Sequence, residues 1–234
     1  MLIRIDDLFT FLAIDENDRD LCIRLAAIAG DRAQGMTDTN DYEALAAIAL
    51  HCRPRRIFEI GTYLGVTSDF FLSILPECEV VSIAYKNPRW KGLGQFYNTS
   101  RLTRKKIGSE VLADRRTRYT QLYGDSHKLE SQSFVKEYGQ FDLVFIDGDH
   151  SAKGVSRDTE LAMRIISETG VICWHDANPK PKFIDVRRFL EEELSLLAVA
   201  TKDEYVGGIA VWSREIENRL NAHSITNQSA PADT

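Results

Sequence analysis

The stretch FDLVFIDGDH, residues 141–150, constrains the fold more than any other part of the chain. Its first part is mainly apolar and β-branched, which is typical of a strand buried in a parallel sheet. The strand ends at Asp147, and Asp149 and His150 follow at once. In an open α/β sheet, ligands bind beyond the carboxyl ends of the strands. The stretch therefore predicts both a central strand and a functional site at its end.

Strands and helices alternate along the rest of the chain. Predicted strands cover residues 55–60, 79–85, 118–123, the stretch from 141, 170–175, 196–201 and 207–212. Predicted helices cover residues 19–29, 40–51, the segment before Pro76, 132–138, 152–167 and 183–194. We expect Thr39 or Asn40 to cap the second helix, and the first two helices to form an outer layer. The pattern predicts an α/β fold, a Rossmann-like doubly wound and mostly parallel seven-stranded sheet with an antiparallel edge strand and helices on both faces.

One domain is expected from the length of 234 residues. Residues 1–38 form a helical segment packing on the core, 39–214 form the main domain, and 215–234 form a polar tail that we expect to be disordered. Residues 85–106 interrupt the alternation with seven Lys and Arg, no acid and several aromatic residues. We interpret this insertion as a lid for an anionic or aromatic substrate; the alternative is a solvated basic loop.

The composition excludes some classes of protein. A net charge of −6 argues against general nucleic-acid binding. The four cysteines show no CxxC spacing, which favours reduced thiols and a cytoplasmic protein. The sequence shows no signal peptide and no apolar run long enough to cross a membrane, so no membrane partner is expected. A homodimer is compatible with the sequence, which does not fix the oligomeric state.

A glycine-containing turn follows the first predicted strand, in EIGTYLGVTS at residues 59–68. Gly61 and Gly65 allow a tight turn and a close approach to a ligand, and the next helix directs its amide groups at that ligand. This arrangement suits a nucleotide or a carboxylate, although such a turn can also serve packing alone. The spacing does not match GxGxxG, which argues against a dehydrogenase.

Acids and histidines follow two neighbouring strands. Asp147, Asp149 and His150 come after one strand, and His175 and Asp176 come after the other. Neighbouring strands lie about 4.8 Å apart, so these groups can meet around one ion. Carboxylates with an imidazole suit Mg²⁺, Mn²⁺, Fe²⁺ or Zn²⁺, and Asp149 or His150 could take a substrate proton. The alternative for each acid is to cap the following helix or to pair with a nearby cation.

These segments, together with YGDS and GVICWHDAN, resemble the class I S-adenosylmethionine-dependent methyltransferases over residues 39–213. The resemblance is to small-molecule O-methyltransferases similar to catechol O-methyltransferase and to the macrolide and aminocoumarin sugar enzymes. It implies methyl transfer from S-adenosylmethionine to a hydroxyl of a small molecule, sugar or glycoconjugate, with Mg²⁺ as the expected metal.

The resemblance also implies roles for individual residues. The cofactor would be held by Glu59, Gly61, Thr62, Tyr63, Gly65, Thr67 and Asp147, with Asp125 and Ser126 beside its adenine. The metal would be held by Asp147, His175 and Asp176. The catalytic base would be Asp149, as in the sugar enzymes, or His150, as in the catechol enzymes.

Two positions depart from the family pattern. Ala84 stands where an acid commonly binds the ribose, and His175 stands where a carboxylate is commoner. These departures keep two rivals open. One is a metal-dependent hydrolase or hydroxylase-like enzyme that does not methylate, and the other is a catalytically silent ligand-binding protein with the same fold.

Overall fold

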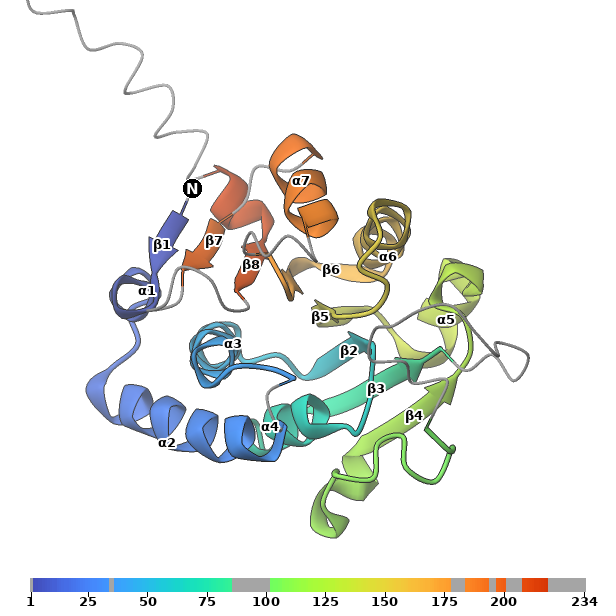
Figure 1. Cartoon of the computed structure of the whole chain (residues 1–234), viewed down its shortest axis with the longest axis horizontal. Coiled ribbons are helices and arrows are strands. Elements are labelled where there is room, and N and C mark those ends of the chain that lie inside the picture. The colour runs from blue at the N-terminus through green and yellow to red at the C-terminus, as the bar shows by residue number, and fades with distance from the viewer. Residues whose placement is uncertain are drawn as a thin grey trace, which may run out of the picture.

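The computed structural model describes residues 2–33, 36–85, 102–177, 184–193, 197–200 and 208–218. Its centre is a sheet in the strand order β1-β7-β8-β6-β5-β2-β3-β4 (Figure 1). The strands are β1 (Leu2–Arg4), β2 (Arg56–Ile60), β3 (Glu79–Ala84), β4 (Tyr119–Tyr123), β5 (Phe141–Ile146), β6 (Ile166–Trp174), β7 (Leu197–Ala200) and β8 (Ile209–Trp212). Among these described strands, only β8 is antiparallel to its neighbours, β6 and β7.

The register of the central strands builds one edge for a site. Ile60 of β2 pairs with Ile146 of β5, and Ile146 pairs with Trp174 of β6. These three strands therefore end at the same level. The residues that follow them emerge together at the carboxyl edge of the sheet, where ligands bind in folds of this class.

Helices cover both faces of the sheet. The helices are α1 (Ile5–Phe11), α2 (Glu16–Ala33), α3 (Thr39–Cys52), α4 (Val66–Ile74), α5 (Ser131–Tyr138), α6 (Ala152–Ile165) and α7 (Ile184–Glu193), with short 3₁₀ helices η2 (Ala113–Arg118) and η3 (Ser126–Lys128). In Figure 1, α1–α4 lie on one side of the sheet and α5–α7 on the other. Alternate strand residues serve the two cores: Ile57 packs with the first group, and Phe58 packs with the second.

Helix α3 lies between α2 and the sheet. Eight of its fourteen residues are buried, and α2 packs along it. The expectation that both helices form an outer layer is therefore correct only for α2. The Asp38 carboxylate caps α3 by accepting a hydrogen bond from the Asn40 amide at 3.0 Å, so neither Thr39 nor Asn40 is the cap. Aspartate fills this place well because its short side chain can reach the first free amides.

The predicted fold class is confirmed, with two differences in detail. The sheet gains an eighth strand, because β1 pairs with β7. A three-residue strand is too short to show an alternating pattern in the sequence. The antiparallel strand β8 lies between β6 and β7, so the edge on that side is β1.

Two predicted segments lie largely outside the described residues. They are the lid, of which residues 86–101 are not described, and the tail, of which residues 219–234 are not described. The four cysteines are free thiols, as predicted. Among the described helices, none combines the length and apolar character needed to cross a bilayer.

Candidate functional site

The turn after β2 is held by close contacts with the protein's own backbone. Gly61 has φ +109°, and a Cβ added there would lie 1.9 Å from the carbonyl oxygen of Asp147. Gly65, with φ +88°, lies against Gly108 in the same way. Tyr63 also has a positive φ of 46°, which is strained for a bulky residue. The two glycines thus let this turn touch the end of β5 and the segment before β4.

A buried polar network lies beneath the turn. Glu59 is 1% exposed, and its carboxylate accepts hydrogen bonds from the hydroxyls of Ser68 and Ser82. Thr62 contacts Ser82 Oγ at 2.6 Å and accepts a bond from Gln121 Nε2 at 3.0 Å. Burial raises the pKa of Glu59 to about 7, and the two hydroxyls partly oppose that rise. Glu59 therefore supports the turn from below.

The second half of the site lies at the ends of β5 and β6. Asp147, His175 and Asp176 each offer a ligand atom, and these atoms all lie within 4.8 Å of one another. His175 Nδ1 lies 3.2 Å from Asp147 Oδ1 and 3.4 Å from Asp176 Oδ2. Asp176 adopts φ 56°, a conformation that aspartate tolerates better than most residues. The structure thus brings the predicted metal ligands together.

The sequence did not indicate Asp41, which completes this cluster from α3. Its side chain is fully buried, and its Oδ2 lies 3.1 Å from His175 Nε2. Its Oδ1 accepts a hydrogen bond from the Gly208 amide at 2.7 Å. The carboxylates around His175 raise the pKa of its imidazole well above the usual value, against the opposing effect of burial.

Of the two candidate bases, His150 lies within the cluster. Its Nε2 is 2.9 Å from Asp176 Oδ2 and 3.4 Å from Asp147 Oδ1. Burial lowers the pKa of His150, but these two carboxylates outweigh it and raise the pKa to about 9. Asp149 is exposed, and its Oδ1 accepts a hydrogen bond from the Ser151 amide at 3.0 Å. The cap of α6 is Ser151, whose side chain accepts a hydrogen bond from the Gly154 amide, so Asp149 does not take the capping role of the alternative.

The two residues expected beside the adenine lie after β4. Asp125 accepts a hydrogen bond from the His127 amide at 3.1 Å, and Ser126 donates to Asp158 Oδ1 at 2.7 Å. His127 Nε2 lies 3.3 Å from the same carboxylate oxygen of the buried Asp158. His127 and Ser126 therefore lie beside the same buried carboxylate. Ala84, the last residue of β3, is fully buried.

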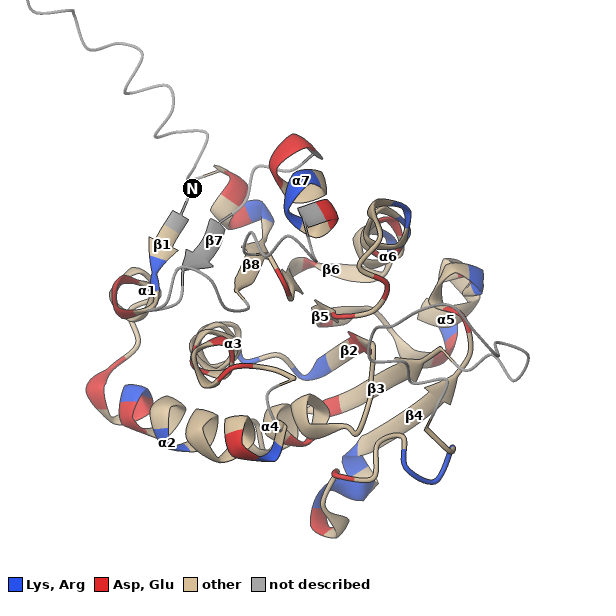
Figure 2. Cartoon of the chain, in the orientation of Figure 1, with Lys and Arg blue, Asp and Glu red and all other residues tan. Residues whose placement is uncertain are grey.

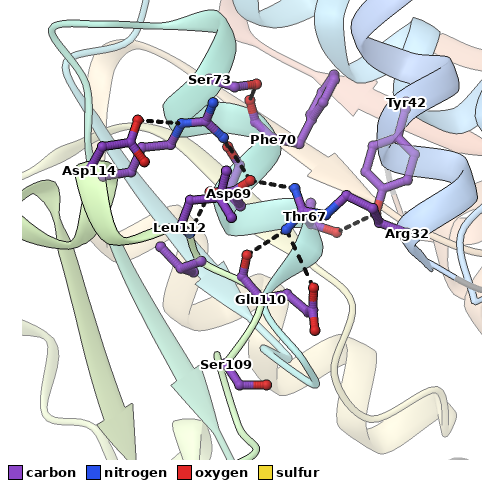
Figure 3. Close-up of polar contacts among 12 residues, drawn as sticks. Arg32, Tyr42, Thr67, Asp69, Phe70, Ser73, Ser109, Glu110, Leu112 and Asp114 are labelled. Carbon is purple, nitrogen blue, oxygen red and sulfur yellow. Dashed lines mark hydrogen bonds and ion pairs between the residues drawn. The ribbon is translucent and has the colours of Figure 1, made fainter.

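A pair of arginines fixes the helix that follows the turn. Asp69, in the first turn of α4, is fully buried and meets Arg32 Nη1 at 2.5 Å and Arg115 Nη1 at 2.7 Å. Its other oxygen accepts a bond from the Leu112 amide at 2.9 Å (Figure 3). The nearby Glu110 amide donates to the carbonyl oxygen of Leu64 in the turn. These contacts tie α2, α4 and the segment before β4 to the turn.

A family described as a methyltransferase domain matches residues 58–177. This match runs from β2 through the turn to the residues that follow β6, and it covers just over half of the chain. The chain belongs to this methyltransferase family. The family prediction is thereby confirmed.

Solved methyltransferases share the fold of this methyltransferase chain. The O-methyltransferase TomG of Streptomyces achromogenes, in complex with S-adenosylmethionine, has a TM-score of 0.51 and 16% identity, covering 81% of this chain and 89% of its own. The Bacillus cereus O-methyltransferase, in complex with S-adenosylhomocysteine, has a TM-score of 0.50 and 19% identity, covering 88% and 94%. PaMTH1 of Podospora anserina, bound to S-adenosylhomocysteine, has a TM-score of 0.51 and 15% identity, covering 88% and 93%. At these identities the likeness shows the fold.

A curated relative is much longer than this methyltransferase chain. The uncharacterized protein y4gI of Sinorhizobium fredii is 24% identical over 177 residues. The match covers 72% of this chain and 18% of the relative. The chain therefore corresponds to a small part of that protein.

Proposed function

We propose that the chain transfers a methyl group from S-adenosylmethionine to a hydroxyl of a small molecule, sugar or glycoconjugate. The observation that carries this proposal is the contact between Gly61 and the Asp147 carbonyl oxygen. It joins the turn proposed to hold the cofactor, residues 59–67, to the cluster proposed to hold the substrate. A methyl donor over the turn and a hydroxyl over the cluster would be neighbours, and positioning supplies much of the rate in such a transfer.

The cluster fits a divalent metal ion by its donor set. Two carboxylates and one imidazole lie close enough to share one cation, and oxygen-rich sets of this kind suit Mg²⁺ or Mn²⁺. Such an ion, held by Asp147, His175 and Asp176, would act as a Lewis acid that binds the substrate oxygen and lowers the pKa of the hydroxyl. His175 ligates only as a neutral ring, so cation and proton compete for it.

His150 is the base that the geometry favours, and because its pKa is about 9, only the fraction of molecules with a neutral ring can take the substrate proton. It lies among the proposed substrate-binding groups, whereas Asp149 contacts the start of α6. We expect His150→Ala to reduce methyl transfer by about 100-fold or more, the usual size of a general-base contribution, while S-adenosylhomocysteine binding is kept. Asp149→Asn is the matched variant, and we expect it to keep most of the activity. Loss of activity in Asp149→Asn with activity retained in His150→Ala would assign the base to Asp149 instead.

The substrate proposed is anionic or aromatic. Arg104, Lys105 and Lys106 are exposed on the segment that passes beside β4, where basic residues colour the ribbon (Figure 2). The Arg104 guanidinium stacks over the ring of Tyr123, with its Cζ 4.9 Å from the ring centroid. Tyr123 ends β4 at the carboxyl edge of the sheet. This basic and aromatic surface supports a substrate that carries negative charge or an aromatic ring.

The test is a calorimetric titration of the protein with S-adenosylmethionine and S-adenosylhomocysteine, with and without Mg²⁺. We expect micromolar binding of both compounds. When hydroxyl-bearing anionic or aromatic compounds are added together with S-adenosylmethionine, we expect S-adenosylhomocysteine to form as the product. Asp147→Ala should abolish the Mg²⁺ effect. Asp142→Ala is its control, because Asp142 lies at the opposite end of β5, where it accepts bonds from the Arg55 and Arg56 amides.

Three other outcomes would contradict the proposal in different ways. Failure to bind either compound would reject the methyltransferase activity. Mg²⁺-dependent hydrolysis without cofactor binding would favour the hydrolase rival. Cofactor binding without transfer to any tested class of compound would favour a silent binding protein, the reading prompted by Ala84.

A further inference from the structure

We propose that Asp41 is a positioning residue that fixes the His175 imidazole in the tautomer able to bind a divalent cation. The proposal rests on the metal-assisted function above. It concerns a residue that lies outside the segment matched by the methyltransferase family, residues 58–177. Asp41 would act through His175 and would not touch the cation or the substrate itself.

The carboxylate of Asp41 leaves His175 one arrangement for its ring. Asp41 Oδ1 is occupied by the Gly208 amide at 2.7 Å, and Oδ2 faces His175 Nε2 at 3.1 Å. An ionised carboxylate can only accept hydrogen bonds, so Nε2 must carry the hydrogen and donate it. In the neutral ring the lone pair is then on Nδ1. Nδ1 is the atom that faces Asp147 and Asp176.

This arrangement has the form that metal-binding histidines usually take. Such a histidine donates its second ring N–H to a carboxylate or a carbonyl, which fixes both the tautomer and the orientation of the ring. Burial strengthens the effect, since Asp41 is fully buried and His175 is 4% exposed. The edge of the ring also packs against Phe145, with the ring centroids 6.3 Å apart. Both contacts hold the ring in place before any cation arrives.

The position of Asp41 in α3 links the two halves of the site. The next residue, Tyr42, lies 3.2 Å from Thr67 Oγ1 through its hydroxyl. Thr67 lies in the first turn of α4, at the end of the segment proposed to hold the cofactor, residues 59–67. One turn of α3 therefore contacts the proposed metal cluster through Asp41 and the proposed cofactor turn through Tyr42.

Asp41→Asn tests the proposal with a nearly isosteric change. The Gly208 amide still requires an acceptor, so the Asn carbonyl oxygen should face Gly208 and its NH₂ group should face His175. The NH₂ group would then donate to Nε2, which moves the ring hydrogen to Nδ1 and blocks the atom needed for the cation. We expect Mn²⁺ and Mg²⁺ binding, measured by calorimetry, to weaken about 10- to 100-fold. S-adenosylhomocysteine binding should be unchanged.

Asp158→Asn is the matched control, because Asp158 is another buried carboxylate that faces a histidine, His127, outside the cluster. We expect it to keep wild-type affinity for Mn²⁺. A second measurement does not depend on any variant: ¹⁵N NMR of the metal-loaded wild type should show His175 with its hydrogen on Nε2.

The outcomes separate this proposal from the function on which it rests. Wild-type Mn²⁺ affinity in folded Asp41→Asn, or a hydrogen on Nδ1 in the metal-loaded wild type, would overturn the role of Asp41 alone. Absence of Mn²⁺ and Mg²⁺ binding by the wild type would reject the metal site and the role of Asp41 together. The S-adenosylhomocysteine titration would still test the methyltransferase function independently of the metal site.

Discussion

Glu59 places an ionisable group where solvent does not reach, and this predicts a specific pH dependence of stability. Its pKa is raised from 4.5 to about 7 in the folded protein. Between these two values the folded state binds more protons than the unfolded state, so stability falls as the pH rises through that window. Ionised Glu59 therefore costs stability at pH 8, by at most about 3 kcal/mol.

Glu59→Gln should remove this cost while keeping a side chain that can bond to Ser68 and Ser82. We expect the melting temperature of the variant, relative to the wild type, to be higher at pH 8 than at pH 5. The measurement is thermal unfolding at both values. Glu79→Gln is the control, because Glu79 is the exposed first residue of β3. An equal shift for Glu59→Gln at the two pH values would contradict the prediction.

Adding one carbon at Gly61 should strongly destabilise the folded protein. Alanine there would meet the Asp147 carbonyl oxygen at 1.9 Å and would have to adopt φ +109°. We expect Gly61→Ala to lower the free energy of unfolding by about 2 to 4 kcal/mol. Urea unfolding of the ligand-free protein measures this loss.

The chain offers a control for the same chemical change. A Cβ added at Gly124 would meet nothing within 4 Å. Gly124→Ala should therefore change the free energy of unfolding by less than about 1 kcal/mol. Similar losses at both glycines would show that the contact between Gly61 and Asp147 does not decide the result.

At the scale of elements, the Asp69 contacts hold three segments together. Removing this carboxylate would leave the guanidinium groups of Arg32 and Arg115 without their buried partner. We expect Asp69→Asn to lower the free energy of unfolding by about 3 kcal/mol. Hydrogen exchange should rise first in α4 and around residues 108–112, because that segment is tied to α4 through the Leu112 amide.

Asp114 provides the comparison for Asp69 on the same arginine. Its carboxylate lies 3.9 Å from Arg115 Nε and is 74% exposed. Exposed ion pairs contribute little, so Asp114→Asn should cost less than about 1 kcal/mol. Equal costs for the two variants would mean that burial does not set the strength of these pairs.

Elements with a clear apolar or periodic signal could be predicted from the sequence, whereas the first strand and the first helix could not. The apolar run of β5 and the alternation of helices and strands gave the sheet and its main helices. Strand β1 and helix α1 have three and seven residues, too few for a periodic pattern to stand out. Their apolar residues, such as Leu8 with no exposed surface, become informative only once packed against the rest of the protein.

At the scale of the whole molecule, the sequence located the cluster but not all of its members. Asp147, His175 and Asp176 follow strands, and the rules for parallel sheets predict where strand ends meet. Asp41 lies in a helix, 134 residues before its partner His175. No local pattern connects the two, because their contact depends on how α3 packs between α2 and the sheet.

The pairing of β1 with β7 also determines when the described sheet can be completed during synthesis. Leu2 pairs with Ala198, so 196 residues separate the two partners in the chain. At about 5 to 20 residues per second, a ribosome needs roughly 10 to 40 seconds to bridge that distance. Helix α1, which follows β1 directly, packs on α3 as well as on β7, so only its contact with β7 has to form after that interval. Strand β1 can therefore join the sheet only after β7 has been synthesised.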